Sequence, residues 1–199
     1  MPVINTNTSA QYAQDALKVN TKTMSTAMQQ LATGNRINAA KDDAAGLSIG
    51  ENFTSQVRGL NQAVRNLNDG INMMQTAEGA LGETSNMLQR MRELAVQSSN
   101  GTYSTTQRTY LQTEFLALSS QIDKIATDTK WNDQSLLVTA ATFTFQAGKD
   151  TGQTVAVTVA AMTLTGLTIA GTAASIGSSV SANASLALLD AAIGLVNAQ

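Results

Sequence analysis

The sequence predicts a mainly α-helical protein, a long antiparallel helical rod that resembles a coiled-coil bundle and carries a small β-hairpin. Three observations predict this fold class. Apolar residues recur at every seventh position through much of 41–97, the only proline is Pro2, and two stretches within 142–159 alternate polar and apolar residues. A sustained heptad repeat is typical of helices that pack lengthwise on other helices. A chain without internal proline has little to interrupt such helices.

The heptad repeat marks one long helix over about 41–97 and gives it a stripe of large apolar residues. At 1.5 Å per residue this helix would be on the order of 80 Å long, which is too long for the core of a compact domain of this size. We therefore expect copies of the same molecule to cover the stripe. The members of this self-assembly stripe are Phe53, Leu60, Leu67, Met74, Leu81 and Leu88.

The N-terminal part of the chain predicts a separate helix. Residues 5–33 carry heptad-spaced apolar residues and few charges, so we expect a neighbour to bury this helix. Gly34, followed by asparagine, is a helix-stop signal. Asp42 or Asp43 is expected to cap the start of the long helix.

Shorter patterns predict the elements that follow the long helix. A second rod helix is expected from about Ser104 to Lys130, antiparallel to the first because the link between them is short. The alternating stretches 142–146 and 154–159 predict a β-hairpin. Residues 171–185 lack periodicity and predict a loop, and a final helix is expected from Leu186 onward.

Composition excludes several classes of function. The net charge of -2 gives no reason to expect nucleic acid or an anionic membrane as a partner. The chain has no Cys and no His, which removes disulfides, thiolate metal sites and the commonest general base. No uninterrupted apolar run reaches 18 residues, so we expect no membrane insertion, and the N-terminus is not a conventional signal peptide. We expect neither an enzyme nor a metal or cofactor.

Several motifs resemble those of bacterial flagellins. The segments Arg36–Gly46 (RINAAKDDAAG) and Leu88–Gln97 (LQRMRELAVQ) are similar to the two most recognisable N-terminal signatures of that family, and Ile4–Asn7, Asn66–Ile71 and Thr76–Leu81 also fit. These matches lie in register over residues 1–137. Further along, 145–148 and 186–193 are similar to the β-element of the family and to the start of its C-terminal helical half.

The resemblance implies a domain organisation. Residues 1–40 would form the N-terminal inner-core helix and its connecting loop, 41–130 the helices of the rod domain, and 131–170 its β-hairpin region. Residues 171–185 would be a short loop in place of the variable outer domain, and 186–199 would begin the C-terminal rod helix. Because the outer domain and the C-terminal helices are lacking, we expect this chain alone not to form a normal filament.

The resemblance also implies a structural function. The chain would be a secreted subunit that passes through the flagellar type III export apparatus and polymerises with copies of itself into the extracellular flagellar filament used for motility. A flagellin-like hook–filament junction protein or a surface adhesin is the alternative. The signature around Lys41–Gly46 favours the filament subunit.

A second role that the resemblance implies is recognition of the monomer by Toll-like receptor 5. The receptor-contacting positions of the family correspond to Arg90 and Leu94 on the long helix and to Glu114 on the next helix, with Gln89 and Gln97 beside them. Arg90 and Leu94 are four residues apart and share a helix face. From spacing alone, Gln89, Arg90, Glu93 and Gln97 would be the solvated side of an amphipathic helix; the presence of the whole signature favours the receptor site.

Overall fold

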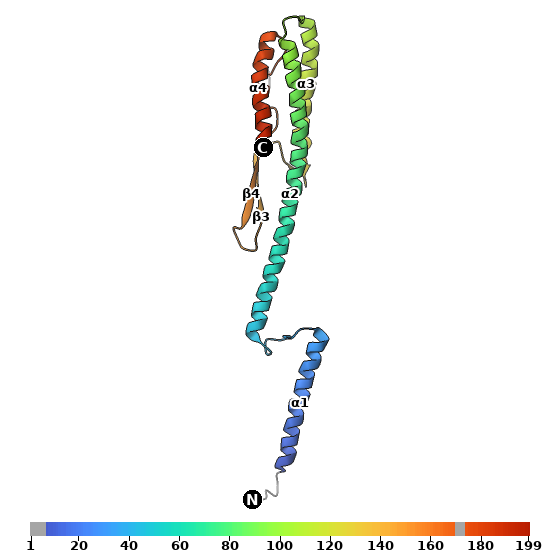
Figure 1. The fold of residues 1–199 in the computed structure, drawn as a ribbon, viewed down its shortest axis with the longest axis vertical. Helices are drawn as coiled ribbons and strands as arrows, with labels where there is room; N and C mark the ends of the chain where they lie inside the picture. The colour runs from blue at the N-terminus through green and yellow to red at the C-terminus, as the bar shows by residue number, and fades with distance from the viewer. Residues whose placement is uncertain (1–6, 170–173) are drawn as a thin grey trace. The chain divides into compact units, whose positions relative to one another are not determined.

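The computed structural model describes residues 7–169 and 174–199, and predictions that concern residues 1–6 and 170–173 lie outside this range. In chain order the elements are α1 (Thr8–Thr33), α2 (Ala44–Ser99), α3 (Thr105–Asp128), β1 (Lys130–Trp131), β2 (Gln134–Ser135), β3 (Ala141–Gln146), β4 (Thr154–Val159) and α4 (Ser179–Asn197) (Figure 1). Helices dominate the described residues, which confirms the predicted fold class. The chain divides into two compact units, Met1–Gly59 and Leu60–Gln199.

The N-terminal unit contains α1, which has well-formed ends and no core. The Asn7 side chain accepts a hydrogen bond from the Ala10 N–H at 3.1 Å, and Gly34 ends the helix in the left-handed region at φ 70, as its sequence predicted. None of the residues Thr8–Thr33 is buried. Leu17 and Leu31 are 69% and 83% exposed, so the apolar face of α1 lies open within this unit.

The connection between α1 and α2 is ordered by two adjacent aspartates. The Asp42 carboxylate accepts hydrogen bonds from the N–H groups of Asn38 and Ala39, at 3.3 and 3.1 Å. The Asp43 carboxylate accepts from the Gly46 N–H at 2.8 Å, in the first turn of α2. Asp43 is therefore the cap that the sequence predicted, and Asp42 shapes the turn before it. A Cβ at Gly46 would come too close to the Asp43 carboxylate, so a side chain there would force the capping carboxylate to shift.

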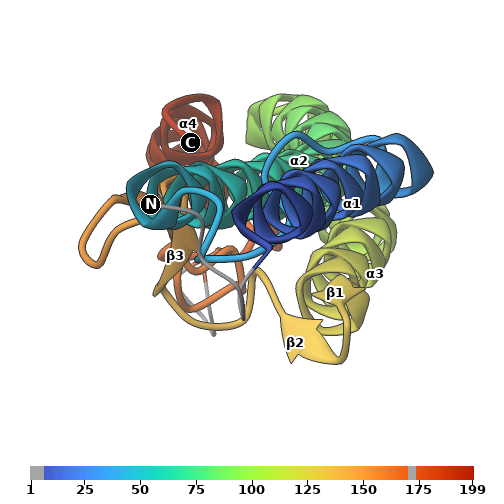
Figure 2. The ribbon, with the colours of Figure 1, turned by 90° about the horizontal axis from the view of Figure 1, so that it is seen from below.

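In the C-terminal unit, α3 and α4 flank the second half of α2 (Figures 1 and 2). The helices α2 and α3 run antiparallel. Arg90 of α2 pairs with Glu114 of α3 at 2.9 Å. Ser98, further along α2, accepts a hydrogen bond at 2.9 Å from the Nε of Arg108, which lies earlier in α3. One hydrophobic core joins these helices to the segment between β4 and α4. Its largest fully buried side chains include Leu88, Met91, Leu94, Phe115, Ile122, Leu136, Leu137, Met162, Leu167, Ile176 and Leu189.

Two antiparallel hairpins follow α3. The predicted hairpin is confirmed: β3 pairs with β4 from Ala141↔Val159 to Gln146↔Thr154. A Cβ at Gly70 of α2 would lie 3.1 Å from the Phe145 ring, so this glycine allows the hairpin to approach the helix closely. The shorter β1–β2 hairpin was not predicted from the sequence. Its turn residues Asn132 and Asp133 both have positive φ, 48 and 63, a backbone that Asn and Asp tolerate better than most residues.

The last helix begins earlier than predicted. A loop was expected over 171–185, of which 171–173 lie outside the described residues, but α4 begins at Ser179. Ser178 and Ser181 form a capping box at its start, and Ala182 and Ser185 are buried. Serine, alanine and asparagine with a single valine, Val180, gave no periodic signal. Tertiary burial and the cap stabilise this helical turn despite the weak local propensity.

Among the described residues, α4 is also the one helix that is long and apolar enough to cross a membrane by length and composition, with a mean hydropathy of 1.5 over its best window. This helix was not predicted as a membrane-spanning candidate from the sequence, because serine and asparagine interrupt its apolar residues. In the structure Leu189 and Val196 lie in the core, and Asp190 pairs with Arg92 of α2 at 2.6 Å. These contacts make α4 a helix of the bundle.

Candidate interaction surfaces

The described residues contain no group of three or more acidic side chains that could hold a metal ion. The features with functional potential are surfaces instead. Two were predicted from the sequence, the self-assembly stripe and the receptor patch. The structure adds a groove beside the β3–β4 hairpin and a hollow along α1.

The self-assembly stripe is exposed at one end and buried at the other. Phe53 and Leu60 are 61% and 48% exposed. Leu67, Met74 and Leu81 are half-buried, and Leu88 is fully buried. The prediction that one continuous stripe faces other subunits is therefore wrong at Leu88, because its side chain lies in the hydrophobic core of the same chain. The heptad repeat therefore continues from residues that are exposed in this chain to one that its core buries.

The first half of α2 carries further exposed apolar residues around the open end of the stripe. We call the following set the exposed α2 face: Ile49, Phe53 and Val57 in the N-terminal unit, and Leu60, Val64 and Ile71 in the C-terminal unit, which are 48–61% exposed. Monomers rarely leave so many large apolar side chains uncovered along one element. A groove of about 320 Å³ adjoins this face, where Leu67, Ile71 and Met74 of α2 approach Phe145 and Val157 of the hairpin.

The predicted receptor patch is assembled only in part. Arg90 donates from Nε and Nη2 to the same Glu114 oxygen, at 3.1 and 2.9 Å, and from Nη1 to Glu93 at 2.8 Å. Gln89 and Gln97 are exposed nearby on α2. Glu93 was not predicted to belong to the patch. Glu93 lies three residues after Arg90 on the same helix face, and this spacing was a usable signal.

Leu94 is the predicted patch residue that the structure corrects. Its side chain is only 1% exposed and belongs to the hydrophobic core, so it cannot offer an apolar contact to a receptor in this structure. The spacing of four residues from Arg90 placed both on adjacent parts of the helix surface, but it did not show where the edge of the core lies. The patch that remains is polar: Gln89, Arg90, Glu93, Gln97 and Glu114.

Ion pairs connect the charged side chains of this polar patch. Hydrogen bonds to Glu93 and then to Glu114 raise the pKa of Arg90 above its ordinary value. A cation whose pKa is raised on folding contributes stability that is complete below the unfolded pKa and is lost only as pH rises through the folded one. Arg90 therefore stays charged at neutral pH. The two carboxylates outnumber the one guanidinium, so the patch carries a net negative charge.

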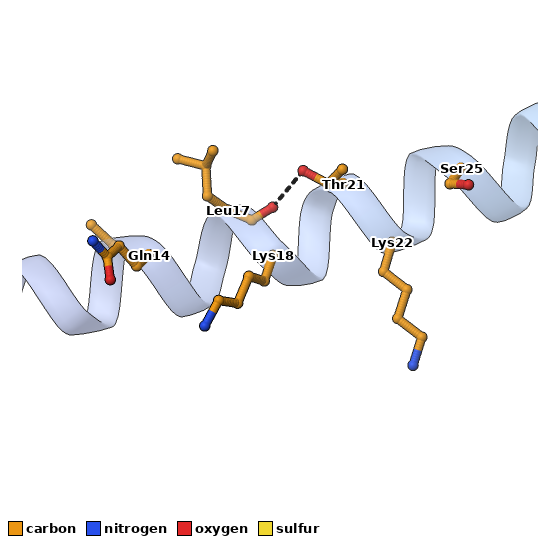
Figure 3. A pocket seen from close by; sticks show the side chains of 7 residues that line it. Gln14, Leu17, Lys18, Thr21, Lys22 and Ser25 are labelled. Carbon is orange, nitrogen blue, oxygen red and sulfur yellow. Dashed lines mark hydrogen bonds between the residues drawn. The ribbon is translucent and has the colours of Figure 1, made fainter.

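A hollow lies along α1 and is lined by Ala13, Gln14, Leu17, Lys18, Thr21, Lys22 and Ser25 (Figure 3). The Thr21 hydroxyl donates to the Leu17 carbonyl at 2.8 Å within the same helix. All of these residues belong to one helix, and one helix cannot enclose a small ligand. We interpret the hollow as part of the open apolar face of α1.

Comparison with known proteins decides the family. The family model for the bacterial flagellin N-terminal helical region matches residues 4–142. This chain belongs to the bacterial flagellin family. Polar flagellin F of Vibrio parahaemolyticus is 45% identical over 169 residues, and flagellin D of Vibrio cholerae is 47% identical over 157 residues. The matched regions cover 84% and 78% of this chain.

The chain spans less than half of the length of these flagellins, 45% of the first and 42% of the second. A solved structure supports the fold independently. The crystal structure of Bacillus cereus flagellin is 34% identical and superposes with a TM-score of 0.59, covering 67% of this chain and 77% of that one. The predicted family is thus confirmed, and flagellins are structural proteins.

Proposed function

We propose that this flagellin chain is part of a secreted subunit that polymerises into the extracellular filament of the bacterial flagellum and serves motility. The exposed α2 face carries this proposal. Six large apolar side chains along one helix, each about half exposed or more, favour burial against other molecules. Contacts between unlike surfaces that repeat without closure produce an open helical polymer. In this proposal the subunit is structural and catalyses no reaction.

The open face of α1 supports the same proposal. A helix with no buried residue gains little stability from packing and depends on a partner to keep its apolar side from water. Assembly with other subunits would supply that partner. In this proposal the flagellar type III apparatus exports the subunit from the cell before the subunit assembles.

The test of the filament proposal is the change Leu60→Asp in the bacterium that makes this chain. Because Leu60 is 48% exposed, we expect the stability of the monomer to change by only about 0.5 kcal/mol. In a filament the carboxylate would be buried without a partner, which costs several kcal/mol per contact. We expect secreted monomer, few or no filaments by electron microscopy and loss of swimming.

The matched control for this experiment is Leu60→Met, which keeps an apolar side chain of similar volume. It should assemble and swim normally. Filaments of normal number and length from Leu60→Asp would show that this part of α2 is not an assembly surface.

We further propose that the monomer is recognised by Toll-like receptor 5 through the polar patch of Gln89, Arg90, Glu93, Gln97 and Glu114. Arg90 is half exposed and is held in place by two carboxylates, which reduces the side-chain entropy that a partner must overcome. Arginine is enriched among the residues that dominate binding energy at interfaces. The patch excludes Leu94, whose contribution is to the core beneath it.

A further inference from the structure

The turn between α2 and α3 contains the sequence Asn100-Gly101, which is the only asparagine–glycine pair in the chain. We propose that Asn100 is a site of spontaneous deamidation, with water as the only co-reactant. The proposal does not depend on the filament or receptor proposals, because it rests on the local geometry of this turn.

The geometry of the turn leaves the reacting groups free. Asn100 is exposed, and its side-chain oxygen accepts a hydrogen bond from the Thr102 N–H at 3.1 Å. Within residues 7–169 and 174–199, neither the Asn100 amide nitrogen nor the Gly101 N–H has a hydrogen-bond partner. A Cβ built at Gly101 would meet nothing within 4 Å, so no neighbour crowds the backbone at this point.

These groups are the reactants of succinimide formation. After the Gly101 N–H loses its proton to hydroxide, the nitrogen attacks Cγ of Asn100. A Cγ–N bond forms, the bond from Cγ to the side-chain nitrogen breaks, and ammonia leaves with a proton from solvent. Water then opens the ring at either carbonyl and gives aspartate or isoaspartate, with no change of oxidation state. The Thr102 N–H polarises the carbonyl that is attacked and stabilises the charge that develops on its oxygen.

The other asparagines provide internal comparisons. Asn72 and Asn86 lie within α2, where the N–H of the next residue donates to a carbonyl one turn earlier and is not available as a nucleophile. Asn132 lies in an exposed turn, as Asn100 does, but the residue after it is Asp133, whose side chain hinders the approach of the backbone nitrogen. Asn100 is therefore expected to react first.

The product would change the charge of the turn. The Arg108 Nη2 donates to the Asn100 carbonyl at 2.8 Å, so an aspartate at position 100 would place a carboxylate beside an existing cation. Isoaspartate would lengthen the main chain by one atom where the Tyr103 N–H donates to the Asn100 carbonyl. The site lies one helical turn from Gln97 of the polar patch.

The experiment incubates the purified full chain at physiological temperature and follows each asparagine by peptide mass spectrometry, with isoaspartate measured by enzymatic methylation. We expect conversion at Asn100 before Asn132, and none at Asn86 over the same period. Gly101→Ala should slow conversion at Asn100 at least about fivefold, equivalent to about 1 kcal/mol of barrier. Gly101 does not have positive φ, so this variant should fold normally, as circular dichroism can verify.

Two results would overturn the proposal. One is equal conversion at Asn100 and Asn132 in the unmodified chain. The other is a folded Gly101→Ala variant that deamidates at Asn100 as fast as the unmodified chain.

Discussion

Replacing Leu94 with alanine is expected to lower the free energy of unfolding by about 2–5 kcal/mol, the usual range for a leucine deleted from a well-packed core. Leu94 is 1% exposed and lies in the core formed by α2, α3, α4 and the segment before α4. Truncation removes apolar contacts and leaves a cavity that the surrounding helices fill only in part. Since about 1.4 kcal/mol is a factor of ten, the folding equilibrium should fall by at least about tenfold.

Urea denaturation followed by circular dichroism measures this effect. Val96→Ala is the matched control, because Val96 is on the same helix two residues away but 48% exposed, and its truncation should cost less than about 1 kcal/mol. If both variants lowered the free energy of unfolding by the same amount, Leu94 would face solvent. Leu94→Met, which roughly conserves volume, should retain most of the stability and should leave receptor activation unchanged.

Reversing the charge of Arg90, by Arg90→Glu, is expected to reduce activation of Toll-like receptor 5 by the monomer more than tenfold, the scale of loss at a dominant interface residue. The change would remove the guanidinium that Glu93 and Glu114 both contact. It would also put a third carboxylate beside theirs. The patch would lose its arginine and the fixed arrangement that the arginine imposes.

A receptor reporter assay with purified monomer measures this loss, and Arg92→Glu is its control. Arg92 also pairs with one carboxylate, Asp190 of α4, so the control breaks a comparable exposed ion pair elsewhere on α2. The Arg92 variant should activate the receptor normally, and both variants should keep native helicity. If Arg90→Glu activated as well as Arg92→Glu, the polar patch would not be the receptor site.

The heptad pattern predicted the long helix correctly but could not say what covers it. Phe53 and Leu88 occupy the same register, yet one is 61% exposed and the other fully buried. An apolar residue gives the same signal whether its cover comes from the same chain or from another molecule. Leu94 was misplaced for the same reason, since position on a helix face does not fix the border of the core.

Local chemistry was predictable where the residue itself determines the backbone. Gly34 ends α1 and Asp43 caps α2, because both act through contacts within a few residues. The early start of α4 was not predictable, since the burial of Ala182 depends on distant partners. The β1–β2 hairpin had a signal in Asn132 and Asp133, but two-residue strands are too short to show alternation.

We infer that other subunits cover the first half of α2, whereas other parts of the same chain cover its second half. Thiol labelling tests it most directly, because the chain has no cysteine and a single introduced thiol gives a clean signal. Leu60→Cys and Leu88→Cys would each be labelled as secreted monomer and in filaments grown by the bacterium that makes this chain. We expect the thiol at position 60 to react in the monomer and to be protected in the filament, and the thiol at position 88 to be protected in both. Equal reactivity at position 60 in monomer and filament would contradict it.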